Sequence, residues 1–116
     1  MEETKIAVLT DGGKIEEELR VQLHHLGYKN TEWFTEVTPF FSYIDETPNV
    51  IMVLSCTGAY SVEIAMNLRD RSASNPLIWF SDLDFGVVSY RVHASWFGMM
   101  PVTEEALKRA FHRVLH

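Results

Sequence analysis

The feature that most constrains the fold is a series of short, uninterrupted apolar runs along the chain. The clearest is Val50–Leu54 (VIMVL), which leads directly into Ser-Cys-Thr-Gly. A run that is apolar at every position, rather than at alternate positions, is typical of a strand buried on both faces of a sheet. Four further runs predict strands, the second of them weaker than the others: Lys5–Leu9, Thr31–Thr35, Leu77–Phe80 and Trp96–Met100.

The segments between these runs carry apolar residues at helical spacing. They predict five helices, over residues 15–26, 39–46, 61–71, 85–92 and 103–114. We expect Thr103 to cap the last helix, which begins with acidic and ends with basic residues, as the helix dipole favours. Regular alternation of strand and helix predicts an α/β fold with a doubly wound sheet of five parallel strands, in one domain over residues 1–116.

Composition limits the classes of function. The chain is 47% apolar and 22% charged, as in an ordinary folded domain, and its net charge of −6 makes it a poor nucleic-acid binder. Its one cysteine cannot form an internal disulfide, which favours a reducing, cytoplasmic location. No apolar stretch approaches the roughly 20 residues of a membrane span, and the N-terminus does not resemble a signal peptide.

The site of a doubly wound sheet lies at the carboxyl ends of its strands. Cys56 is the candidate nucleophile there, because a thiol at a helix N-terminus can have a lowered pKa. A phosphocarrier or thiol enzyme that uses Cys56 is therefore one hypothesis, although no arginine follows closely to hold a phosphate. The other interpretation of Cys56 is a small, half-buried turn residue. The predicted strand ends are Thr10-Asp11, Ser55-Cys56, Ser81-Asp82 and Met100-Pro101.

The acidic and histidine residues do not predict a metal site. Asp11 is a lone carboxylate, and one carboxylate binds magnesium poorly. Asp82 and Asp84 follow the fourth predicted strand, where capping of the next helix explains them. His24 and His25 are adjacent on a helix and therefore point in different directions. We expect no catalytic residue, no metal and no other cofactor, so the chain is not predicted to be an enzyme.

Three segments together resemble the receiver domain of bacterial two-component response regulators from end to end. KIAVLTDGGKIEEELRVQLHHLGY is similar to the family's opening strand, acidic pair and first helix. NPLIWFS resembles the fourth strand, and SYRVHASWFGMMPVTEEALKRAFHRVL resembles the closing segment. The closing segment is most similar to receivers that precede LytTR-type DNA-binding domains. The resemblance implies the flavodoxin-like (βα)5 receiver fold.

The family's acidic residues are largely replaced in this chain. Its acidic pair falls on Thr10 and Asp11, so half of the pair is lost. The phosphoacceptor aspartate falls on Val53, Leu54 or Ser55, depending on where a gap is placed. None of these three residues can form an acyl phosphate. Asp11 is therefore predicted to be the remnant of a metal site rather than a working one.

The other functional positions of the family are partly retained. The switch hydroxyl falls on Ser81 and the switch aromatic on Phe97. The lysine that contacts the phosphoryl group is replaced by Met100, although the proline after it remains as Pro101. Phosphoryl transfer to a carboxylate needs a metal and a cation to neutralise charge. Once the acceptor is lost, the metal ligand and the cation are no longer needed, so the three replacements agree with one another. We expect Met100, Val53 and Leu54 to make the former pocket more apolar.

The resemblance implies a degenerate receiver, or pseudo-receiver, that serves signal transduction and transcription regulation by protein–protein contact without phosphorylation. A partner or a second copy would dock on the face of the fourth helix, fifth strand and fifth helix. DNA would be bound only through an output domain outside this chain, and no membrane contact is expected. A stand-alone adaptor that binds a partner or small ligand in the altered pocket is the remaining alternative. The predicted contact residues are Tyr90, Trp96, Phe97, Met99, Lys108, Arg109 and Arg113.

Overall fold

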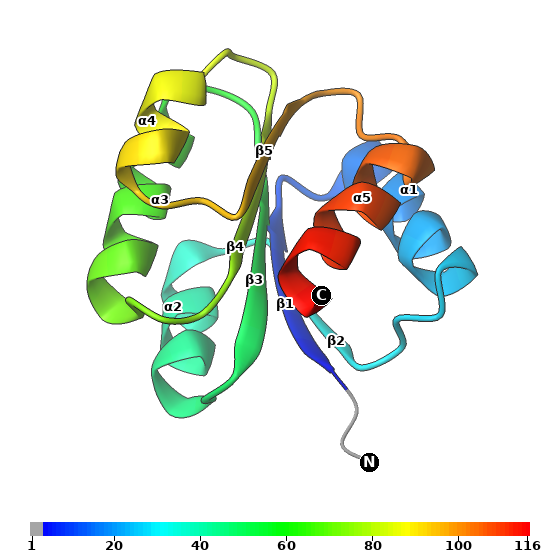
Figure 1. The fold of residues 1–116 in the computed structure, drawn as a ribbon, viewed down its shortest axis with the longest axis horizontal. Coiled ribbons are helices and arrows are strands. Elements are labelled where there is room, and N and C mark those ends of the chain that lie inside the picture. The colour runs from blue at the N-terminus through cyan, green and yellow to red at the C-terminus, as the bar shows by residue number, and fades with distance from the viewer. Residues whose placement is uncertain (1–3) are drawn as a thin grey trace.

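The computed structural model describes residues 4–116, which form one five-stranded parallel sheet between two layers of helices (Figure 1). Helices α1 and α5 cover one face, and α2, α3 and α4 cover the other. The strand order is β2-β1-β3-β4-β5. The strands are β1 (Lys5–Thr10), β2 (Thr31–Phe34), β3 (Val50–Ser55), β4 (Leu77–Ser81) and β5 (Trp96–Met99). The helices are α1 (Gly13–His25), α2 (Val37–Glu46), α3 (Tyr60–Arg71), α4 (Gly86–Arg91) and α5 (Glu104–Leu115).

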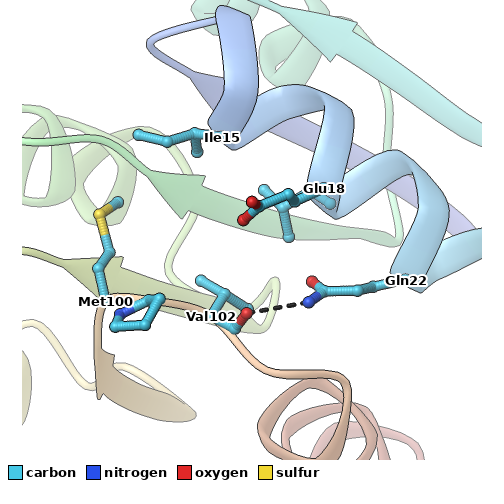
Figure 2. A pocket seen from close by; sticks show the side chains of 7 residues that line it. Ile15, Glu18, Gln22, Met100 and Val102 are labelled. Atoms are coloured by element: carbon cyan, nitrogen blue, oxygen red, sulfur yellow. Dashed lines mark hydrogen bonds between the residues drawn. The ribbon is translucent and has the colours of Figure 1, made fainter.

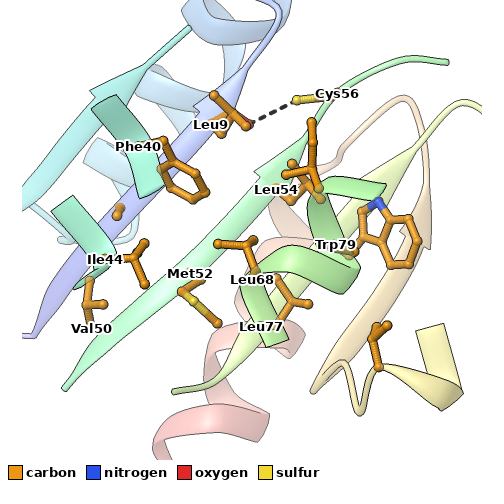
Figure 3. Close-up of a cluster of buried hydrophobic side chains, with 14 residues drawn as sticks. Leu9, Phe40, Ile44, Val50, Met52, Leu54, Cys56, Leu68, Leu77 and Trp79 are labelled. Atoms are coloured by element: carbon orange, nitrogen blue, oxygen red, sulfur yellow. Dashed lines mark hydrogen bonds between the residues drawn. The ribbon is translucent and has the colours of Figure 1, made fainter. Parts of the chain in front are cut away.

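The central strand β3 explains the architecture, because all six of its residues are buried. Its side chains alternate between two apolar clusters, one on each face of the sheet. Met52 and Leu54 lie in the cluster under α2, α3 and α4, part of which Figure 3 shows. Ile51 and Val53 lie in the cluster under α1 and α5. The unbroken apolar run Val50–Leu54 is therefore needed to fill both cores, as in other parallel sheets.

The predicted fold class and all five predicted strands and helices are confirmed. The first, third and fourth strands each run one residue further than predicted, through Thr10, Ser55 and Ser81. These hydroxyl residues are buried and continue the parallel ladder, in which Thr10 pairs with Ser55. Thr103 caps α5 as predicted, since its hydroxyl accepts a hydrogen bond from the Ala106 amide at 3.1 Å. Within residues 4–116, no helix combines the length and apolar character required to cross a membrane.

Candidate functional site

The end of β3 is the centre of the candidate site. Ser55 is the last residue of this strand and lies between Thr10 of β1 and Phe80 of β4 in the ladder. Its hydroxyl is buried and has no hydrogen-bond partner among the described residues. Val53 and Leu54 are fully buried on opposite faces of the sheet. None of the three predicted acceptor positions therefore presents a carboxylate at the strand end.

Asp11 follows β1 and binds the loop that leaves β3. Its Oδ2 accepts hydrogen bonds from the backbone amide of Thr57 at 2.8 Å and from the Thr57 hydroxyl at 2.6 Å. Thr10 turns away from this contact: its hydroxyl accepts from the Gly12 amide at 2.9 Å and donates to Glu16 at 3.4 Å. The role of Thr57 was not predicted from the sequence. The one hint there is its place in the turn after β3, between Cys56 and Gly58.

Asp82 performs a similar task from the end of β4. Its Oδ1 accepts a hydrogen bond from the backbone amide of Gly58 at 2.8 Å. The prediction that Asp82 caps the following helix is therefore wrong, because its carboxylate turns toward the loop after β3 instead. Asp84 does lie at the start of α4, where it accepts from the Gly86 amide at 3.0 Å. Consecutive amides of the β3–α3 loop are thus each bound by a carboxylate from a neighbouring strand end.

Cys56 belongs to the core rather than to the surface of the site. Cys56 is 6% exposed, and its Sγ donates to the Leu9 carbonyl at 3.5 Å. Figure 3 draws this contact as a dashed line. Burial, together with the nearby negative charge of Asp11, raises the pKa of the Cys56 thiol to about 12. A thiol in this state is a poor nucleophile at neutral pH. The geometry favours the interpretation of Cys56 as a packed turn residue.

Ser81 is the last residue of β4, and Phe97 lies within the neighbouring strand β5. The Ser81 hydroxyl is buried and accepts a hydrogen bond from the Leu83 amide at 3.2 Å. Phe97 is half-buried, with its ring edge-on to Trp79 at a centroid distance of 5.3 Å. Both side chains are therefore fixed by local contacts in this conformation.

Met100 and Pro101 line a different cavity from the one that Asp11 lines. Together with residues of α1 they line a cavity of about 280 Å³, which Figure 2 shows. Val53 and Leu54 line none of the cavities at this edge, so the expectation of one shared apolar pocket is wrong for them. The reason is the pleat of β3, which directs both side chains into the two cores.

The residues at the strand ends do not fit a magnesium ion. Magnesium prefers several oxygen ligands in octahedral geometry, and Oδ2 of Asp11 is already occupied by Thr57. Over residues 4–116, no three His, Cys, Asp or Glu side chains are grouped so that they could hold a metal ion.

Comparisons with known proteins identify the architecture. No family model matches the chain, and no curated protein sequence matches it. Solved structures do match. A response regulator receiver domain protein from Clostridium thermocellum has a TM-score of 0.80 and 18% identity, over 97% of this chain and 94% of its own. Chemotaxis protein CheY4 of Vibrio cholerae has a TM-score of 0.78 and 14% identity, over 97% and 99%. The beryllofluoride-activated NtrC4 receiver domain dimer has a TM-score of 0.76 and 18% identity, over 96% of each chain. The chain has the receiver fold.

Within this receiver fold, the predicted contact face divides into exposed and half-buried residues. Tyr90 on α4 is 84% exposed and Met99 on β5 is 48% exposed. Lys108, Arg109 and Arg113 on α5 are also exposed. Trp96 and Phe97 are half-buried and pack against the two cores, so they contribute less to the surface than predicted.

Sequence reasoning missed one strongly exposed apolar residue of the same helix. Val87 on α4 is 71% exposed and lies one helical turn before Tyr90. In the sequence, Val87 is marked only by its place in the short apolar stretch Val87-Val88. The sequence does not show which of the two faces outward; in the structure Val88 packs on the core and Val87 does not.

Proposed function

We propose that this chain is a degenerate receiver domain that acts in two-component signal transduction and transcription regulation by protein–protein contact, without phosphorylation of an aspartate. It works in the cytoplasm and catalyses no reaction of its own. DNA binding would belong to an output domain outside this chain, of the LytTR type that the closing segment resembles.

One observation carries this proposal: no Asp or Glu occurs from residue 47 to residue 62. This segment contains all of β3 and the whole loop that follows it. The conclusion therefore does not depend on which of Val53, Leu54 or Ser55 occupies the acceptor position. An acyl phosphate requires a carboxylate, and the segment that would supply it has none.

The groups around the strand end also favour a site that does not bind a phosphoryl group. Such a group carries negative charge and needs cations or free N–H donors around it. The amides of Thr57 and Gly58 are instead bound to the carboxylates of Asp11 and Asp82. Met100 supplies no charge where a lysine would be needed. An incoming anion would therefore meet two carboxylates rather than free donors.

The exposed apolar residues of α4 and β5 support the proposed contact face. Val87, Tyr90 and Met99 present apolar surface to solvent on a domain of net charge −6. Exposed aromatic and methionine side chains are enriched in protein interfaces. The similar NtrC4 receiver domain was solved as a dimer, and a homodimer through α4, β5 and α5 is the first assembly to test here.

The test is a titration of nitrogen-15-labelled protein with magnesium and beryllofluoride, a mimic of an aspartyl phosphate, followed by amide NMR shifts. We expect no saturable shift at millimolar reagent. Saturable shifts centred on Asp11, Ser55 and Ser81 would show that another acid accepts the group, and the proposal would fail.

A restored variant provides the matched control. Thr10→Asp and Met100→Lys return the acidic pair and the cation to the positions where the resemblance places them. Ser55→Asp adds an acceptor at the last residue of β3, one of the three candidate positions. This triple variant should give saturable shifts under the same conditions. A response of the wild type equal to that of the restored variant would contradict the proposal.

A further inference from the structure

The cavity between α1 and the segment after β5 is a formed pocket with a chemical preference. Its volume is about 280 Å³, just below the usual range for small-molecule sites. Figure 2 shows Ile15, Glu18 and Gln22 of α1 on one wall, with Met100 and Val102 on the opposite wall. The remaining lining residues are Leu19 and Pro101.

A hydrogen bond between two lining residues ties the walls of the pocket together. Gln22 donates from Nε2 to the Val102 carbonyl at 2.9 Å, which joins the last turn of α1 to the segment between β5 and α5. Further along the same two elements, His25 contacts Glu104 at 3.0 Å. Because both walls are fixed by contacts of the protein itself, the pocket exists before a ligand arrives.

The polar groups of this pocket are acceptors. The Oε1 of Gln22 is buried and has no donor among residues 4–116. The Glu18 side chain is 50% exposed, and it pairs with Lys14 at 3.8 Å, whose side chain is itself 87% exposed. Exposed pairs of this kind are weak, so Glu18 remains able to attract a second cation. The other lining residues are apolar.

We propose that this pocket binds a small molecule with an apolar body and a protonated amine. The apolar part would lie against Met100, Val102 and Ile15, and the ammonium would lie beside Glu18. The net charge of −6 favours a cation over an anion at long range. The inference goes beyond the proposed function, because binding here does not depend on whether an aspartate can be phosphorylated.

The test uses three probes of one shape: 2-phenylethylamine, 2-phenylethanol and phenylacetate, which are cationic, neutral and anionic at pH 7. Each is titrated into carbon-13- and nitrogen-15-labelled protein, and the Met100 methyl and the amides of Ile15 and Val102 are followed. We expect saturable shifts at these groups with the amine, weaker binding of the alcohol and no saturation with phenylacetate.

Charge-matched variants on α1 make the test specific. Glu18→Gln should weaken the amine about two- to fivefold, the range expected for a partly exposed ion pair, and leave the alcohol unchanged. Glu17→Gln removes the same charge from an exposed residue that does not line the pocket and should have no such effect. Ile15→Trp should fill the pocket and abolish binding of both probes.

Three results would overturn the proposal. The first is equal binding of the three probes. The second is shifts that never saturate or that lie away from Met100. The third is an equal loss of amine affinity in the Glu17→Gln and Glu18→Gln variants. None of these results bears on the beryllofluoride titration, so failure of this proposal and failure of the proposed function are distinguishable.

Discussion

Thr57 donates two hydrogen bonds to the same carboxylate oxygen of Asp11, from its backbone amide at 2.8 Å and from its hydroxyl at 2.6 Å. The next amide, that of Gly58, donates to Asp82. Two carboxylates from two strand ends therefore fix the first turn of the loop after β3. Asp11 has a structural role in this arrangement, which accounts for an acid at this position without a metal.

Replacing Asp11 by Ala should lower the free energy of unfolding by about 1–2 kcal/mol, because two hydrogen bonds to a charged acceptor are lost at a partly solvated site. Urea denaturation measures the change. Thr57→Val removes only the hydroxyl bond and should cost less. Asp70→Ala removes an exposed acid of α3 that makes no hydrogen bond or ion pair within residues 4–116, and should change stability little.

The double variant Asp11→Ala, Thr57→Val tests whether the two residues act on each other. We expect the two single losses to sum to more than the double loss, because the hydroxyl bond can be broken only once. Strict additivity would contradict the direct contact. Hydrogen exchange should also become faster at the Thr57 amide in the Asp11→Ala variant.

The fold was predictable because parallel sheets leave a local signature. A strand buried on two faces carries an almost unbroken apolar run, and Val50–Leu54 shows this without reference to any distant residue. The cap at Thr103 is equally local, since its partner amide lies three residues away. Such features depend on residues that are neighbours in the sequence, so they can be predicted from the sequence alone.

The contacts of the site were less predictable because they join residues far apart in the chain. Asp11 and Thr57 are separated by 46 residues, and Gly58 and Asp82 by 24. Sequence alone placed Asp82 at a helix start, since capping is the common local role of an acid there. Only the meeting of three strand ends in space turns this carboxylate toward Gly58 instead.

Cys56 should react slowly with an alkylating reagent in the folded state at pH 7. The side chain is buried and its thiol pKa is about 12, so very little thiolate is present. Labelling with iodoacetamide, followed by mass spectrometry with and without urea, measures the difference. Rapid labelling of the folded protein would revive the hypothesis of thiol chemistry.

The same pKa predicts a loss of stability in alkaline solution. The folded state keeps its thiol proton up to a pH of about 12, whereas an unperturbed cysteine thiol, as in the unfolded chain, loses it near 9.0. The native state therefore binds more protons between these values, and the free energy of unfolding falls as pH rises through this window. The stability difference between wild type and Cys56→Ala isolates this effect from Tyr28, whose pKa is also raised by burial.

Arg69 joins two loops to the end of α3, and its loss should be costly. Its guanidinium donates to the carbonyls of Val92, His93, Ser72 and Asn75 at 2.8–3.0 Å. Burial lowers the pKa of Arg69. The guanidinium nevertheless keeps its charge and supplies the N–H groups for all four hydrogen bonds. Arg69→Met keeps the apolar stem and should lower stability by about 2–3 kcal/mol, since several hydrogen bonds are lost together.

A neighbouring arginine provides the control for Arg69. Arg71 pairs with Asp45 and stacks on Phe41 at the surface, so Arg71→Met should cost about 1 kcal/mol or less. Thermal or urea denaturation of both variants gives the comparison. Equal losses would show that Arg69 acts as an ordinary surface residue.

Gly98 in β5 leaves room for the ring of Phe80. A Cβ at this position would lie 2.9 Å from Cε1 and 3.0 Å from Cδ1 of that ring, and Phe80 is fully buried. Gly98→Ala should therefore lower the free energy of unfolding by about 1–3 kcal/mol through overpacking. Adding Phe80→Leu should cost less in the Gly98→Ala background than in the wild type, because the shorter side chain relieves the clash.

Tyr90 should matter for association and not for folding. Its side chain is 84% exposed, so Tyr90→Ser should change the free energy of unfolding by no more than about 0.5 kcal/mol. Phe97→Ala provides the contrast, because the Phe97 ring packs edge-on to Trp79. This variant should lower the free energy of unfolding by about 3 kcal/mol, a value at the low end for aromatic residues in a core, since Phe97 is half-buried.

If α4 and β5 form a contact face, Tyr90→Ser will lower self-association measured by sedimentation equilibrium while its unfolding midpoint stays constant. Unchanged association in both Tyr90→Ser and Val87→Ser would remove this face from the proposed dimer.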